Sequence, residues 1–363
     1  MSALDFAPVT TTRRSGDQER AQVLADPGFG RHFTDFMAHA RWTREGGWVE
    51  SRILPFGPLE ISPAAAVLHY GQEIFEGLKA FRHADGSVWT FRPERNGERL
   101  QRSARRLALP ELAVEDFLTS LRELARADEP WVPEGTGEAS LYLRPFMIAS
   151  EEFLGVRASH QVDYYVIASP AGAYFPRGVQ PLVVWITDEY ARAGAGGTGA
   201  AKCGGNYASS LLGKTMASEK GADEVLFLDS ETHTNIDELS GMNVFALTRD
   251  GRLLTPTLTG SILEGVTRES VLRLAQERGL EAVEQRLVMS EVLDQLGSGE
   301  ITEMFACGTA AVITPIGEFR AHGGSWTVGD GGAGETTLAL RRELTDIQYG
   351  RLPDRHGWLT RLV

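Results

Sequence analysis

The spacing of hydrophobic and polar positions along the chain predicts an α+β protein. From Trp48 onward the pattern is strand-like, and several runs alternate apolar and polar residues as strands with one buried face do. Two helices are predicted among these runs, at 93–107 and 114–127; the second begins with acidic residues, which suit a helix N-terminus. Because strands outnumber helices and hairpins are frequent, we expect mixed or antiparallel sheets and not a doubly wound parallel sheet.

Two short turns indicate hairpins. Ala84-Asp85-Gly86 separates one pair of apolar runs, and Asp250-Gly251 separates another. Further strands are predicted at 48–56, 58–62, 66–82, 140–149, 162–169, 181–187, 224–230 and 301–309, and further helices at 207–220, 263–278 and 336–349.

The length of 363 residues predicts two domains, at roughly 150 residues per domain. The best candidate for a linker mixes proline and glycine between two apolar runs, which is a chain-breaking signal. We therefore expect a smaller N-terminal α/β domain at 1–172 with an irregular lead-in at 1–45, a linker at 173–180, and a larger C-terminal domain at 181–363.

Composition and charge exclude several classes of protein. The formal net charge of −13 argues against general nucleic-acid binding, which needs clustered cations. No apolar run reaches the roughly 18 residues of a membrane span, and the N-terminus lacks the apolar core of a signal peptide. The two cysteines, Cys203 and Cys307, cannot form a disulfide framework or a zinc site and fit a reducing cytoplasm. We expect a cytoplasmic protein without a metal.

Only four of the 36 basic residues are lysines, so chemistry that needs a neutral amine has few candidates. Lys79 lies in an alternating strand, and Lys214 and Lys220 lie on a helix, where exposed lysines are usual. Lys202 is different, because its neighbours from Gly199 to Gly205 have almost no side-chain bulk. A lysine that a flat cofactor must approach needs such neighbours, together with partial desolvation to lower its pKa.

Two apparent nucleotide-binding motifs fail on their context. Residues 194–199 match G-x-G-x-x-G, but they neither leave a strand directly nor open a helix. Gly213-Lys214-Thr215 resembles the end of a phosphate-binding loop, yet it lies within a predicted helix and Ala208 replaces the required first glycine. Neither motif supports a nucleotide-binding enzyme.

Eight segments between about Trp48 and Pro315 resemble the branched-chain amino acid aminotransferases, which are fold-type IV enzymes dependent on pyridoxal 5′-phosphate (PLP). They occur in the order found in that family and surround Lys202. The segments are HYGQEIFEGLKAFR, FRPERNGERLQRSARRL, SLYLRPFMIA, GAYF, AKCGGNYASSL, ELSGMNVF, GVTR and CGTAA.

The resemblance implies a set of residues that bind PLP. Lys202 would be attached to the cofactor and would then move the proton at the substrate Cα. Glu238 would pair with the pyridine nitrogen, and Tyr207 would hydrogen-bond the phenolate oxygen. Arg99 would bind the phosphate, although other arginines crowd the same helix. Further donors to the phosphate would come from Val266, Thr267 and Thr309.

The resemblance also implies substrate-binding residues and a partner. Arg144 would meet the distal carboxylate of glutamate or 2-oxoglutarate. Residues 151–156 resemble a mobile loop that closes over the partner subunit's site in homodimers. The other substrate-binding residues implied are Tyr70, Phe75, Tyr142, Tyr174, Thr309 and Ala310.

The expected reaction is transamination of L-leucine, L-isoleucine or L-valine with 2-oxoglutarate, giving branched-chain 2-oxo acids and L-glutamate. One departure is that Ala311-Val312-Ile313-Thr314 stands where some family members have a redox-active C-x-x-C; another is Ser240, where some relatives have glycine. The alternatives are a D-amino acid aminotransferase or an aminodeoxychorismate lyase of the same fold, and a catalytically silent relative that acts as a binding protein.

Overall fold

The computed structural model describes residues 4–8, 15–135, 137–173 and 178–363, and the chain divides into two compact units. We call them the first unit and the second unit and describe each by itself. The first unit comprises Met1–Pro176, Ala201–Gly204 and Asp346–Val363, and the second comprises Arg177–Ala200 and Gly205–Thr345.

This division differs from the expected domains in two segments. The segment with Lys202 and the C-terminal residues belong to the first unit by their contacts, whereas the sequence predicts both in the C-terminal domain. The cause is packing: Cys203 and Leu362 are buried in the hydrophobic core of the first unit. Residues 174–177 of the expected linker lie outside the described residues.

The first unit is built on one mixed sheet with the strand order β1-β3-β2-β8-β7-β5-β6-β18, in which β4 also pairs with β7. Only β1 and β3 run parallel among the recorded strand pairs of this sheet. Its strands are β1 (Ala7–Pro8), β2 (Phe36–Thr43), β3 (Gly47–Pro55), β4 (Glu73–Phe75), β5 (Leu78–Arg82), β6 (Val88–Phe91), β7 (Ser140–Ala149), β8 (Gln161–Ala171) and β18 (Leu359–Arg361). Its helices are α1 (Asp17–Ala25), α2 (Ala66–Tyr70), α3 (Pro93–Arg106), α4 (Val114–Ala127) and the 3₁₀ helix η1 (Glu129–Trp131).

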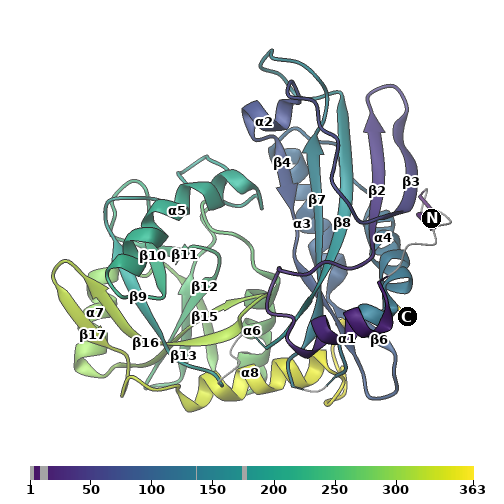
Figure 1. Ribbon diagram of the computed structural model, residues 1–363. Helices are drawn as coiled ribbons and strands as arrows, with labels where there is room; N and C mark the ends of the chain where they lie inside the picture. The colour runs from purple at the N-terminus through teal and green to yellow at the C-terminus, as the bar shows by residue number, and fades with distance from the viewer. Residues whose placement is uncertain (1–3, 9–14, 136, 174–177) are drawn as a thin grey trace. The chain divides into compact units, whose positions relative to one another are not determined.

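Helices α3 and α4 cover one face of this sheet (Figure 1). Leu100 of α3 and Phe117 of α4 pack in the same core as the odd-numbered residues of β7, such as Leu141 and Leu143. The even-numbered residues of β7 are only partly buried, which is the alternation expected of a strand between two different surroundings. Tyr142 and Arg144 therefore project from the face opposite the helices.

The second unit is built on another mixed sheet, with the strand order β11-β10-β9-β16-β15-β12-β13-β14 and β17 paired to β16. Its strands are β9 (Leu182–Thr187), β10 (Glu224–Leu228), β11 (Ile236–Leu239), β12 (Asn243–Thr248), β13 (Arg252–Pro256), β14 (Glu281–Gln285), β15 (Ile301–Gly308), β16 (Val312–Ala321) and β17 (Gly324–Thr327). Its helices are α5 (Gly204–Glu219), α6 (Val266–Glu277), α7 (Met289–Ser298) and α8 (Glu335–Gln348), of which α5 begins and α8 ends with residues of the first unit.

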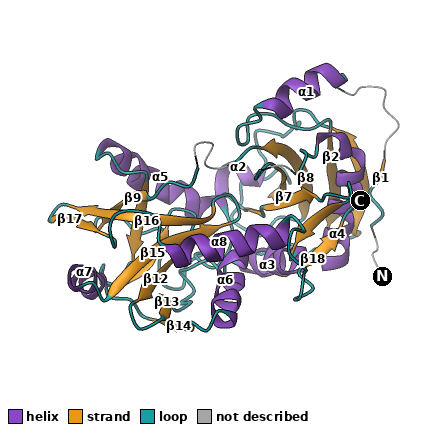
Figure 2. Ribbon diagram, turned by 90° about the horizontal axis from the view of Figure 1, so that it is seen from below, coloured by secondary structure: helices purple, strands orange, loops and turns teal. Residues whose placement is uncertain are grey.

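Helices cover both faces of the second sheet. Ala217 of α5 packs on Trp185 and Phe227, whereas Val292 of α7 packs with Leu226 on the other face. Figure 2 shows α5 and α7 on opposite sides of β9, β16 and β15. No helix in the described ranges has the length and apolar character needed to cross a membrane.

The predicted α+β class with mixed sheets is confirmed. Helices at 93–106 and 114–127 agree with the sequence pattern, and both predicted hairpins form, as β5–β6 and β12–β13. The strand expected at 58–62 is absent, and the strand expected at 66–82 is interrupted, because 66–70 forms a short helix ended by left-handed Gly71 (φ 58°).

The lead-in expected to be irregular contains β2, which pairs with β3 and β8 in the sheet interior. Its sequence, FMAHARWT, buries small alanines on the core side, so its hydrophobic signal is weak. His39 and Arg41 alternate with those alanines, and both contact Asp163 of β8, at 2.7 and 2.9 Å. The partner that allows these polar residues in an interior strand lies far along the chain.

Candidate active site

Lys202 is held in the first unit by its own main chain. Its N–H donates to Ser103 Oγ of α3 at 2.9 Å, and its carbonyl oxygen accepts from the N–H of Phe75 at 2.9 Å. Two residues later, the N–H of Gly204 donates to the Glu73 carboxylate. These contacts tie the lysine to both α3 and β4, so its amine has a defined surrounding.

That surrounding includes a buried ion pair between Arg99 and Glu76. Nε and Nη2 of Arg99 each donate to a different carboxylate oxygen of Glu76 at 2.8 Å, and Asn96 Nδ2 donates at the same distance. Glu76 is fully buried. Burial alone would raise the pKa of Glu76, but Arg99 and then Lys202 more than offset this and lower it. Glu76 therefore stays ionised and fixes the direction of the guanidinium.

The amine of Lys202 is set up to be neutral more readily than an ordinary lysine. Burial and the Arg99 guanidinium lower its pKa to about 8, against a smaller opposing effect of Glu76. Its Nζ lies 4.6 Å from the centroid of the Phe75 ring. A pKa near 8 suits a group that must both accept and give up a proton near neutral pH.

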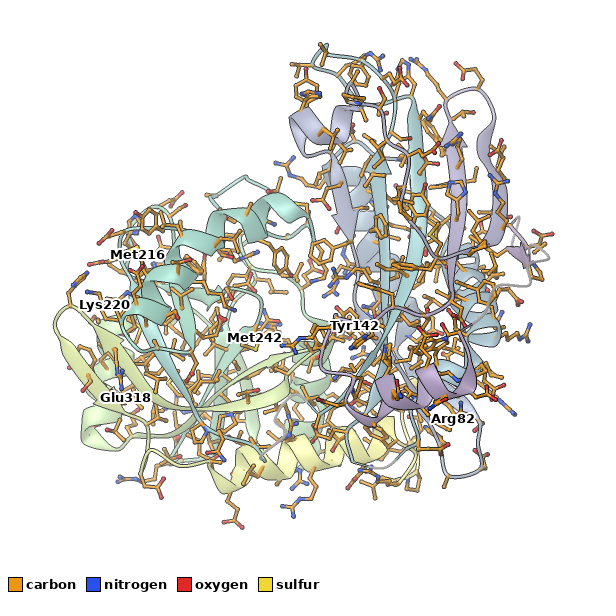
Figure 3. All side chains as sticks on the ribbon, in the orientation of Figure 1. Arg82, Tyr142, Met216, Lys220, Met242 and Glu318 are labelled. Carbon is orange, nitrogen blue, oxygen red and sulfur yellow. The ribbon has the colours of Figure 1, made fainter. Side chains whose placement is uncertain are left out.

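Arg144 and Tyr142 lie on the sheet face that α3 and α4 leave uncovered. Arg144 Cζ is 4.7 Å from the Phe75 ring centroid and 5.4 Å from that of Tyr142, which is labelled in Figure 3. Nη2 of Arg144 donates to the Tyr142 hydroxyl at 3.2 Å, whereas its buried Nε has no hydrogen-bond partner among the described residues. A half-buried guanidinium between two aromatic rings with an unused donor suits an anionic ligand.

Another predicted substrate-binding residue, Tyr70, contacts a different segment of the first unit. Tyr70 is 40% exposed at the end of α2, and its hydroxyl donates to the carbonyl of Leu154 while its ring lies near Phe153. It therefore contacts the loop predicted to be mobile. Tyr174 lies outside the described residues.

In the second unit, Glu238 is the centre of a buried polar group. Its side chain is 3% exposed, and Oε1 accepts from the N–H of Leu263 at 2.8 Å. Oε2 lies 3.4 Å from Asn243 Nδ2, which also donates to the carbonyl of Leu263. Arg192 Nη2 lies 2.5 Å from Oε1. The carboxylate is thus paired, and it is not the solvated strand-edge acid that it could have been.

The loop after Glu238 brings other predicted residues close to it. Gly241 lies so near to the Tyr207 ring that a Cβ there would be 3.5 Å from Cε1. Its carbonyl oxygen also approaches Gly308, at 3.4 Å from the position of a Cβ. Thr309 follows Gly308 directly, so Tyr207, Glu238 and Thr309 belong to one neighbourhood of the second unit.

The remaining predicted phosphate donors lie at a helix start and in a turn. Val266 and Thr267 are the first two residues of α6, whose N-cap Gly265 provides no side-chain cap. Thr309 and Ala310 form the partly buried turn between β15 and β16. Amides at a helix N-terminus and in a tight turn are suited to an anion such as a phosphate.

Sequence reasoning missed three residues of these two groups: Glu76, Arg192 and Asn243. Glu76 lies in the segment that carries the resemblance, next to Phe75, and a buried carboxylate beside a candidate phosphate arginine is a signal that the pattern could have given. Asn243 also lies in a segment that carries the resemblance, ELSGMNVF, whereas Arg192 gave no such signal, because its partners are assembled only by the fold.

Each unit, taken by itself, offers groups of the kind that PLP requires. Lys202 supplies an amine of lowered pKa, and the first unit places the cations Arg99 and Arg144 among its electrostatic neighbours. The second unit supplies uncapped helix amides, a buried carboxylate and a tyrosine. An amine, cations for a phosphate and a carboxylate for a ring nitrogen are the groups that PLP requires.

Comparison with known proteins shows the family. The profile of the amino-transferase class IV family matches residues 73–319, and the chain belongs to that family. The chain is also 52% identical to the branched-chain-amino-acid aminotransferase of Mycolicibacterium smegmatis over 362 residues, which cover 99% of this chain and 98% of the relative.

Solved structures agree with this assignment. The branched-chain amino acid aminotransferase of Escherichia coli has a TM-score of 0.74 and 28% identity, covering 90% of this chain and 100% of that one. The branched-chain amino acid aminotransferase from Thermobaculum terrenum, in its PLP form, has a TM-score of 0.74 and 25% identity, covering 91% of this chain and 98% of that one. The predicted family and fold are therefore confirmed.

Proposed function

We propose that this protein is a PLP-dependent branched-chain amino acid aminotransferase. It transfers the amino group of L-leucine, L-isoleucine or L-valine to 2-oxoglutarate and gives branched-chain 2-oxo acids and L-glutamate. The observation that carries the proposal is the 52% identity to a branched-chain-amino-acid aminotransferase over nearly the whole chain, together with the lowered pKa of Lys202 beside Arg99. Class IV aminotransferases use pyridoxal phosphate.

Bound PLP supplies an electron sink that stabilises negative charge at the substrate Cα. Lys202 is proposed to take the proton from Cα as a neutral amine and to return it, and the pKa of about 8 supports this role. The attachment of its main chain to Ser103 and Phe75 supports a fixed position for the amine during the transfer.

Each other cofactor-binding residue has a specific proposed task. Arg99, oriented by Glu76, binds the phosphate, and Glu238 holds the proton on the ring nitrogen. Tyr207 donates to the phenolate oxygen. The remaining phosphate donors are proposed to be Val266, Thr267 and Thr309.

The substrate residues explain how one pocket accepts two kinds of side chain. The Phe75 ring offers an apolar surface for an isobutyl group, whereas Arg144 offers a cation for the distal carboxylate of glutamate. The unused Nε of Arg144 supports this second role. Tyr70, Tyr142 and Tyr174 are proposed to line the pocket, and the turn at Thr309 and Ala310 to hold the α-carboxylate.

We also propose that the protein is a cytoplasmic homodimer. Three exposed apolar side chains of the first unit support the proposal that a second copy of the chain binds there. Leu68 is 60%, Leu154 66% and Val156 90% exposed. Such a group is covered in many oligomers. The two cysteines, both free and buried, support a reducing compartment. Light scattering coupled to size-exclusion chromatography measures the assembly, and a monomer at micromolar concentration would exclude the homodimer.

A substrate screen tests the proposed activity against its nearest alternatives. The purified protein with PLP is given L-leucine, L-isoleucine, L-valine or D-alanine together with 2-oxoglutarate, and L-glutamate formation is measured. We expect turnover with the three L-amino acids and little with D-alanine. Preference for D-alanine, or release of product without any 2-oxo acid, would instead support a D-amino acid aminotransferase or a lyase.

A further inference from the structure

Arg192 lies in the loop between β9 and α5, yet it is one of the most deeply buried charged residues of the second unit. Its side chain is 3% exposed. A charged residue is almost never buried this far unless it is paired, so its partners define its role. Nothing in the sequence pattern distinguishes Arg192 from the other 31 arginines.

The partners of Arg192 come from four separate parts of the second unit. Nη2 lies 2.5 Å from Oε1 of Glu238, and it donates to the carbonyl oxygens of Gly199 at 2.9 Å and Ser261 at 2.8 Å. The carbonyl oxygen of Arg192 accepts from Ser209 Oγ of α5 at 2.6 Å. One residue therefore joins β11, the segment just before Lys202, the 261 loop and α5.

Gly199 packs closely against the loop that contains Ser261. A Cβ at Gly199 would lie 2.1 Å from the carbonyl oxygen of Ser261, and the N–H of Ala200 donates to the Gly260 carbonyl at 2.9 Å. Segment 199–200 is thus fastened to the 260–261 loop, and the Arg192 guanidinium bonds to both. This segment ends two residues before Lys202.

The geometry at Glu238 divides the tasks of its two oxygens. Oε1 lies 2.5 Å from Arg192 Nη2 and accepts from the N–H of Leu263, and Oε2 lies 3.4 Å from Asn243 Nδ2. A buried carboxylate without a cation favours its protonated form, and a protonated acid cannot hold a proton on a neighbouring ring nitrogen. The Arg192 cation removes that tendency and directs Oε1.

We propose that Arg192 is a positioning residue for the cofactor: it keeps Glu238 ionised and in place for the pyridine nitrogen, and it fastens the chain segment just before Lys202. This inference rests on the proposed function, because it assumes that Glu238 meets the ring nitrogen of PLP. Arg192 acts through Glu238 and the 199–202 segment.

The test compares PLP binding by Arg192→Met, Arg192→Lys, Glu238→Gln and the double variant Arg192→Met/Glu238→Gln. The readouts are the equilibrium affinity of the apoprotein for PLP and the visible absorbance of bound PLP, which responds to the protonation of the ring nitrogen. Arg268→Met is the matched control, because Arg268 is equally buried in the same unit but pairs with Glu284 at 2.6 Å.

We expect Arg192→Met to weaken PLP binding by about 10- to 100-fold, the range found for residues that orient metal ligands. Its absorbance should move to that of Glu238→Gln, and Arg192→Lys should restore part of both readouts. Because the two residues act as a pair, the double variant should bind PLP within about threefold of the weaker single variant. Arg268→Met should lower the melting temperature and leave the absorbance unchanged.

Wild-type affinity and absorbance in Arg192→Met would overturn the inference. It would also be overturned if the loss of PLP affinity in the double variant equalled the product of the losses in the two single variants. If Arg192→Met does not fold, the same two readouts of Arg192→Lys and of the double variant test the inference. The double variant leaves no unpaired buried charge. Wild-type protein that binds no PLP would refute the proposed function; wild-type protein that binds PLP and transaminates while the Arg192 variants behave normally would refute only this inference.

Discussion

At the scale of residues, the chemistry proposed for the first unit depends on the buried ion pair of Arg99 and Glu76 beside Lys202. Glu76 pairs with Arg99 through two hydrogen bonds and lowers the net positive charge near Lys202. Without Glu76, the buried Arg99 would lose the carboxylate that accepts two of its hydrogen bonds, and the Lys202 amine would face more positive charge. The Glu76–Arg99 pair therefore serves both stability and the state of the lysine.

Glu76→Gln should destabilise the apoprotein by about 3–5 kcal/mol, because it removes one charge of a buried ion pair. Glu111→Gln is the matched control. It removes the exposed carboxylate that pairs with Arg105, which lies on the same helix as Arg99, and it should cost less than about 1 kcal/mol. Urea unfolding followed by tryptophan fluorescence measures both. Equal midpoints for wild type and Glu76→Gln would show that the pair contributes nothing.

The lowered pKa of Lys202 predicts a pH dependence of the apoprotein's stability. In the folded protein this pKa is about 8, below the ordinary value of 10.5, so the unfolded chain holds the proton to higher pH. The resulting cost is complete below pH 8 and disappears as the pH rises through 10.5. Relative to Lys202→Met, the wild type should gain up to about 3 kcal/mol between pH 7 and 10.5. A constant difference in unfolding free energy over that range would contradict the assignment.

Candidate site residues can be proposed from the sequence where their neighbours carry the signal. Lys202 is distinguished by the small residues around it, and Glu238, Tyr207 and Arg99 by motifs in a fixed order. Their partners Glu76, Arg192 and Asn243 were not predicted, because each contact joins positions that only the folded chain brings together. The three-dimensional site therefore contains charges that a linear pattern does not reveal.

At the scale of elements, the long helices were predictable and the weak strands were not. The helix at Val114–Ala127 has acidic residues in its first turn and a proline soon after its end, so both boundaries are local features. Strand β2, by contrast, has polar residues that need Asp163, and the strand expected at 58–62 has no partner strand to form it. Sheet pairing is non-local, so local alternation alone overpredicts some strands and misses others.

The end of α4 provides an element-scale prediction. Asp128 is fully buried at the C-cap of α4, and burial together with the nearby Asp35 carboxylate raises its pKa to about 7. Because the folded pKa lies above the unfolded value, this residue favours the folded state at low pH, and that contribution is lost as the pH rises through 7. Asp128→Asn removes the charge with little change of shape.

Relative to Asp128→Asn, the wild type should lose stability between pH 4.5 and 8, by up to about 4 kcal/mol. Unfolding free energies of both proteins at the two pH values measure this difference. Asp26→Asn, at the exposed C-cap of α1, is the control and should change little with pH. A wild type that gains stability relative to Asp128→Asn over this range would contradict a raised pKa.

At the scale of the whole molecule, the sequence predicts the α+β class but not how the chain is shared between the two units. The segments 201–204 and 346–363 join the first unit because Cys203 and Leu362 complete its core. A division by sequence position cannot show this, since the chain leaves and re-enters the first unit. Lys202 is consequently carried by a short segment whose neighbours on both sides belong to the second unit.

The proposed PLP-dependent transamination of branched-chain amino acids requires the amine of Lys202. The most direct measurement is a single half-reaction: protein loaded with PLP is mixed with L-leucine and no acceptor, and the 2-oxo acid and pyridoxamine phosphate formed are counted per site. We predict one equivalent of each for the wild type and for Lys220→Ala, and none for Lys202→Ala. A wild type that leaves leucine unchanged, or a Lys202→Ala variant that converts it at the wild-type rate, would contradict the account.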